Sequence, residues 1–83
     1  MITAGRIAFS KAGRDKGLPF AVVNADDTFA YLVNGKMRPL KNPKKKKLIH
    51  LQLTSSYLPN ESLKTDKEIR KALALYADTR QPA

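Results

Sequence analysis

The sequence predicts a mainly β protein: a small, five-stranded, partly closed barrel followed by one C-terminal α-helix. Through the first 54 residues, short apolar stretches rich in β-branched and aromatic residues alternate with Gly, Pro, Asn and Asp, as in short antiparallel strands. Beyond residue 65 the apolar residues recur at helical spacing. Five short strands in an open sheet would leave unpaired edges, so we expect the sheet to close and the helix to cover one side or end of it.

Turn residues separate the expected strands. Pro19 has no amide to donate and belongs at the start of a strand. Asp26–Asp27 predicts a tight turn, because Asp hydrogen-bonds its own backbone there. Asn34–Gly35 predicts a type I′ hairpin between the third and fourth strands, and a loop carrying Lys44–Lys47 is expected after the fourth. The expected strands are Gly5–Ser10, Pro19–Ala25, Thr28–Val33, Lys36–Leu40 and Leu48–Leu53.

The C-terminal segment has the pattern of an amphipathic helix over about residues 65–80. Thr65 and Glu68 have the spacing of a capping box at its start, and Pro82 cannot continue a helix. An 83-residue chain is expected to form a single domain, residues 1–83, with the barrel over about residues 5–54. The apolar stripe of the helix is formed by Ile69, Ala72, Leu73 and Tyr76.

Positive charge is concentrated in one stretch, Lys36–His50, which contains no acidic residue. The formal net charge is +9, and the basic residues outside this stretch are nearly balanced by the seven acidic ones. Affinity for a polyanion depends on how many phosphates are neutralised together, so this concentration favours nucleic acid as the partner. A solvated loop or a localisation-like patch is the alternative for the lysine run. The cations are Lys36, Arg38, Lys41, Lys44, Lys45, Lys46 and Lys47.

A second basic segment lies between the first two strands. Lys11, Arg14 and Lys16 accompany Gly13 and Gly17, and Asp15 cancels part of their field. Glycine in such a loop provides a positive φ, and it also lets a phosphate approach the backbone amides. The three cations have two interpretations, phosphate contact or solvation of a surface loop.

Other residue types argue against catalysis. There is no cysteine and only one histidine, His50, so we expect no metal site and no cofactor. No nucleophile–base pair or other catalytic constellation can be assembled, and an enzyme is the least favoured class.

Most of the aromatic residues are expected in the core, which leaves Tyr57 as the best candidate for an exposed aromatic. The expected core aromatics are Phe9, Phe20, Phe29, Tyr31 and Tyr76. The sequence shows neither an apolar membrane span nor a secretory signal, so we expect a cytoplasmic protein with no membrane partner.

The run Gly5–Gly17, followed by Phe20–Val23, resembles the KOW motif, which is a strand, a glycine-bearing basic loop and a second strand. Asn34–Leu40 and Lys47–Thr54 resemble the later strands of archaeal and eukaryotic large-subunit ribosomal proteins of that group, and short stand-alone bacterial KOW-domain RNA-binding proteins are more similar still. The resemblance covers roughly residues 5–78. It implies an SH3-like barrel that binds RNA through the loop around Gly13. The four-lysine run is not a signature of that family.

The favoured hypothesis is therefore a non-enzymatic RNA-binding domain, with ribosomal or other structured RNA as the partner and association with the ribosome or translation proteins. The alternative is a protein-interaction module that docks on an acidic surface of the translation or transcription machinery. The expected RNA-binding residues are Lys11, Gly13, Arg14, Lys16, Lys36, Arg38, Lys41, Lys44, Lys45, Lys46 and Lys47.

Overall fold

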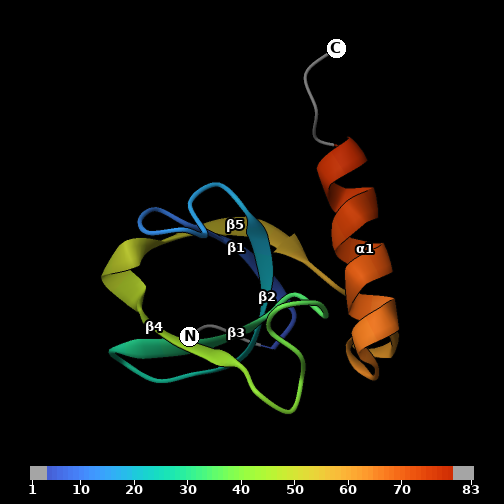
Figure 1. The fold of residues 1–83 in the computed structure, drawn as a ribbon, viewed down its shortest axis with the longest axis horizontal. Helices are drawn as coiled ribbons and strands as arrows, with labels where there is room; N and C mark the ends of the chain where they lie inside the picture. The colour runs from blue at the N-terminus through green and yellow to red at the C-terminus, as the bar shows by residue number, and fades with distance from the viewer. Residues whose placement is uncertain (1–3, 80–83) are drawn as a thin grey trace.

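A computed structural model describes residues 4–79 as one five-stranded antiparallel sheet with a C-terminal helix packed beside it (Figure 1). The strand order in the sheet is β4-β3-β2-β1-β5. No helix in the described part of the chain has both the length and the apolar character needed to cross a membrane. The elements are β1 (Arg6–Ser10), β2 (Pro19–Ala25), β3 (Phe29–Val33), β4 (Lys44–Lys47), the 3-10 helix η1 (Leu48–His50), β5 (Leu51–Tyr57), the 3-10 helix η2 (Asn60–Leu63) and α1 (Asp66–Thr79).

The sheet curves round into a small barrel, as the sequence predicts (Figure 1). Its two end strands, β4 and β5, are joined directly by η1. The backbone of η1 is attached on both sides, because Leu48 N–H donates to Thr28 O (2.8 Å) and Lys11 N–H donates to His50 O (2.8 Å). These bonds hold the connection across the gap between the end strands.

The central strands are buried on both faces. One set of alternate residues fills the barrel, and the other set packs under α1. The register aligns Ile7 with Ala21 and Ala21 with Val33, which makes one row of side chains beneath the helix. The cluster inside the barrel is Ala8, Phe20, Val22, Ala30, Leu32 and Leu51. The cluster under the helix is Ile7, Ala21, Val33, Leu58, Ile69 and Leu73.

The helix begins as the capping pattern predicts. Thr65 Oγ1 accepts a hydrogen bond from Glu68 N–H (3.1 Å), which satisfies one of the free amides of the first turn. Ile69 and Leu73 are buried, and Ala72 and Tyr76 are partly buried against them, so the predicted apolar stripe is confirmed. The predicted end of the helix near residue 80 lies outside the described residues.

The predicted fourth strand, Lys36–Leu40, is wrong, and so is the type I′ hairpin before it. Only glycines have positive φ in the described chain, which excludes that turn at Asn34. Asn34 Oδ1 instead accepts hydrogen bonds from the N–H groups of Lys36 and Arg38, both at 3.0 Å, in a side-chain-closed turn.

The reason is that this turn packs against the start of α1. Arg70 Nη1 donates to Gly35 O (2.8 Å), and Leu40 N–H donates to Asp66 Oδ1 (2.8 Å). A Cβ on Gly35 would overlap Asp66 O and crowd Arg70. Contacts distant in the sequence therefore decide the conformation of a dipeptide that favours a hairpin locally.

The start of the predicted fifth strand is also wrong. Leu48–His50 forms η1, and β5 begins at Leu51 and runs on to Tyr57. Ile49 lies in η1 and is 73% exposed, whereas Leu51, at the start of β5, is buried. The turn predicted at Asp26 is confirmed, because Asp26 Oδ1 accepts hydrogen bonds from Phe29 N–H and Thr28 N–H. These two bonds hold the pKa of Asp26 below its usual value, and the bond from Phe29 has the larger effect.

Candidate nucleic-acid interface

The four-lysine run forms β4, and the prediction that it is a loop is wrong. β4 pairs with β3 in the register Phe29–Lys47, Ala30–Lys46, Tyr31–Lys45 and Leu32–Lys44. Lysine has low β-propensity, but this strand ends the sheet, and lysines on an end strand are a common protection against pairing with other chains. Backbone pairing with β3 thus overrides the local preference.

The lysines alternate between the two faces of β4. Lys45 and Lys47 are exposed, whereas Lys44 and Lys46 lie opposite Leu32 and Ala30, whose side chains fill the barrel. Lys45 Nζ lies 4.2 Å from the centroid of the Phe29 ring, a cation–π contact.

Lys44 and Lys46 reach across to the loop between β1 and β2, residues 11–17. Lys44 Nζ forms an ion pair with Asp15, and Lys46 Nζ donates to Ala12 O (3.0 Å). The hydrogen bond from Lys44, helped by the charges of Lys46 and Arg38, holds the pKa of Asp15 below its usual value. The two basic segments that the sequence identifies separately are therefore joined in the fold.

Backbone bonds also order the 11–17 loop. Gly17 N–H donates to Ser10 O (3.0 Å), and Lys16 N–H donates to Gly13 O (3.2 Å). Gly13 and Gly17 have φ of +80° and +84°, which confirms the positive φ expected of glycine in this loop. A Cβ on Gly13 would lie 3.9 Å from Lys46 Nζ, which is an ordinary van der Waals contact. The positive φ at this position, and not a lack of space for a side chain, is therefore what favours glycine.

Most of the predicted binding residues belong to this joined region. The side chains of Lys11, Arg14 and Lys16 are exposed on the loop, and Lys41 is exposed just before β4. Lys36 is the exception, because it lines a groove beside α1 together with Met37 and Arg70. We call the region formed by residues 11–17, Arg38, Lys41 and β4 the basic surface.

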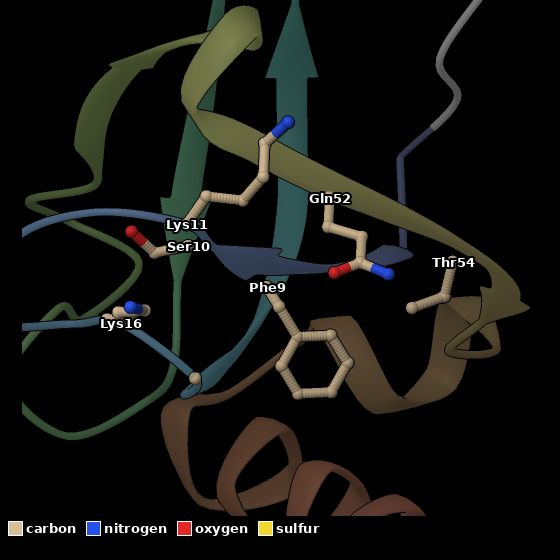
Figure 2. A pocket seen from close by; sticks show the side chains of 7 residues that line it. Phe9, Ser10, Lys11, Lys16, Gln52 and Thr54 are labelled. Atoms are coloured by element: carbon tan, nitrogen blue, oxygen red, sulfur yellow. The ribbon is translucent and has the colours of Figure 1, made fainter.

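Beside the loop lies an open hollow of about 490 Å³ on β1 and β5 (Figure 2). Its lining contains residues that the sequence analysis did not assign to a site. Phe9 was expected in the core but is only partly buried, and Gln52 is exposed. The only sequence signal was the alternation of β5, which puts Gln52 on the face opposite Leu51. The hollow is lined by Phe9, Ser10, Lys11, Lys16, Gly17, Gln52 and Thr54.

The aromatic predictions are partly confirmed. Phe20 is buried, whereas Phe29, Tyr31 and Tyr76, like Phe9, are only partly buried. Tyr57 is 49% exposed as expected, although it lies within β5 and not beyond the last strand. The Arg6 guanidinium lies 5.7 Å from its ring centroid, and Arg6 Nε donates to Thr54 O (2.7 Å).

The residues with acid–base potential have structural positions. His50 is exposed at the end of η1, and Asp26 accepts two backbone bonds in its turn. Among the described residues, no three His, Cys, Asp or Glu side chains come together as metal ligands.

The basic surface can donate hydrogen bonds to anions and can neutralise their negative charge.

No protein-family model and no curated protein matches this sequence.

Proposed function

We propose that the protein is a non-enzymatic RNA-binding domain that contacts the phosphates of structured RNA. Ribosomal RNA is the favoured target. The observation that carries this proposal is the contact of β4 with the 11–17 loop through Lys44 and Lys46. Exposed cations from distant parts of the sequence then neutralise neighbouring phosphates together, which is what affinity for a polyanion requires.

The tethered loop supports the same function. Its conformation is fixed before binding by the ion pair at Asp15 and by its own backbone bonds, so little order has to be gained with RNA. The KOW-like sequence around Gly13 supports it independently. Contacts of this kind give affinity and register and read little sequence. In this proposal the protein acts in the cytoplasm, on the ribosome or with translation-associated proteins.

Filter binding to a structured ribosomal RNA fragment over a range of salt concentrations tests the proposal. We expect binding at moderate salt, with an affinity that falls steeply as salt rises. Lys67→Gln/Lys71→Gln is the matched control, because both lysines are exposed on α1 and lie outside the basic surface. No detectable binding at moderate salt, or a loss of affinity in this control equal to that of changes in the basic surface, would contradict the proposal.

Docking on an acidic protein segment is a second candidate, favoured by the groove beside α1. Met37 and Leu18 line this groove and are 78% and 46% exposed, and Lys36 and Arg70 add positive charge. Exposed apolar side chains with a charged border are typical of a protein contact. A pull-down with wild type and Met37→Asp, each with and without ribonuclease, tests it. Acidic partners that survive ribonuclease and are lost with Met37→Asp would support docking, and partners lost with ribonuclease would exclude it.

A further inference from the structure

The hollow next to the basic surface combines an aromatic ring, an amide and two ammonium groups. Figure 2 shows the Phe9 ring and the Gln52 amide in the middle of the hollow, with Lys16 on one side and Thr54 on the other. Its volume of about 490 Å³ lies within the range of about 300–1,000 Å³ that is usual for small-ligand sites.

The β1–β5 pairing places these groups together. Phe9 lies opposite Gln52 in the register, and Lys11 follows β1 directly, in the same loop as Lys16. The Phe9 ring packs against Tyr76 of α1, with the ring centroids 6.3 Å apart and tilted by 40°. The aromatic part of the hollow is therefore held from the helix side and does not need to be ordered by a ligand.

The polar groups differ in what they can offer. Ser10 Oγ donates to Ala12 O (2.8 Å), and Thr54 Oγ1 donates to Ile7 O (2.7 Å), so both hydroxyl protons are used within the protein. Within residues 4–79, no protein group forms a hydrogen bond with the side-chain amide of Gln52. That amide offers a donor and an acceptor side by side, which matches the edge of a nucleobase.

We infer that this hollow binds one unpaired nucleotide of the RNA, an inference that rests on the proposed function. The base stacks on Phe9, Gln52 bonds the base edge, and Lys11 and Lys16 contact the flanking phosphates. Unpaired bases are the part of a folded RNA that aromatic side chains can stack on, and a glutamine amide pairs well with adenine. The preferred ligand is therefore a paired stem with an extruded adenosine, with the stem on the basic surface.

The test compares two RNAs by fluorescence anisotropy: a hairpin stem with a single-adenosine bulge and the same stem without it. We expect the wild-type protein to bind the bulged stem about tenfold more tightly, in line with one base–aromatic stack. In Phe9→Leu and in Gln52→Leu this preference should fall toward one, with the affinity for the fully paired stem unchanged. Asn60→Leu, which removes an exposed amide outside the hollow, should keep the preference.

The outcomes separate this inference from the proposed function. Equal, tight binding of both RNAs by the wild type would overturn the nucleotide site and leave RNA binding intact. No binding of either RNA would overturn both. Because Phe9 also packs on Tyr76, a thermal melt is recorded for each variant. If Phe9→Leu is poorly folded, the Gln52→Leu result alone decides the test. A bulge preference that survives in every variant that folds would overturn the inference. If both variants fold and only Gln52→Leu keeps the preference, Gln52 is not part of the site.

Discussion

Lys46 donates a hydrogen bond of 3.0 Å from its ammonium group to the backbone carbonyl of Ala12, 34 residues earlier in the chain. Together with the ion pair between Lys44 and Asp15, it ties the end strand β4 to the loop between β1 and β2. Half of the four-lysine run therefore shapes the loop, and the other half, Lys45 and Lys47, is left on the exposed face.

This division predicts different effects for the two halves of the run. Exchanging Lys45 and Lys47 for Gln should leave the fold intact and reduce the dependence of RNA affinity on salt. Each lost phosphate contact should lower the log–log slope by about 0.7 to 0.9. A salt titration by filter binding measures the slope, and circular dichroism checks the fold.

Lys44→Gln/Lys46→Gln is the matched comparison. These changes remove the same charge but also free the 11–17 loop, so we expect a lower melting temperature and weaker RNA binding. If the Lys45/Lys47 variant is folded and keeps the wild-type slope, the exposed face of β4 does not contact RNA.

The elements that sequence reasoning predicted correctly are those fixed by local patterns. Pro19 marks the start of β2, and Thr65 with Glu68 marks the start of α1. β4 was missed because its partner β3 supplies the pairing, and four lysines carry no strand pattern. Both basic segments of the site were identified, but their contact depends on the curvature of the sheet, and the place of Gln52 in the hollow depends on the β1–β5 register.

The ion pair at Asp15 predicts a dependence of stability on pH. The pKa of Asp15 is lowered in the folded protein, so ionised Asp15 favours the folded state. This contribution is complete above the carboxyl's ordinary value and is lost as pH falls through the folded value. Asp15→Asn should therefore melt below wild type at pH 7, and the difference should shrink as the pH falls toward 3.

Asp27→Asn is the control for the pH series, since Asp27 is exposed and forms no ion pair in the described chain. Thermal melts at several pH values make the comparison. A difference between Asp15→Asn and wild type that stays constant down to pH 3 would show that the ion pair does not contribute to stability.

Gly35, which lies where the 34–40 turn contacts α1, is predicted to tolerate a side chain less well than Gly17 does. It has φ of +77°, and an added Cβ would overlap Asp66 O, which belongs to the backbone of α1 and cannot move like a side chain end. Strain and overpacking together suggest a loss of about 3 kcal/mol or more in the free energy of unfolding for Gly35→Ala. Urea denaturation measures it, and a loss below that of Gly17→Ala, where an added Cβ meets nothing within 4 Å, would contradict the packing argument.

Gly13 separates backbone strain from RNA contact. Its φ of +80° disfavours a β-branched residue, so Gly13→Val should lower the free energy of unfolding by about 1–3 kcal/mol. The loop should shift, Lys46 should lose its bond to Ala12, and RNA binding should weaken at temperatures where the variant is still folded.

Gly13→Asn is the matched control, because Asn tolerates positive φ and the space beyond Gly13 is open except for Lys46 Nζ at 3.9 Å. We expect Asn to recover most of the stability and of the affinity. Melts paired with RNA titrations test this, and wild-type stability together with wild-type affinity in Gly13→Val would remove Gly13 from the candidate site.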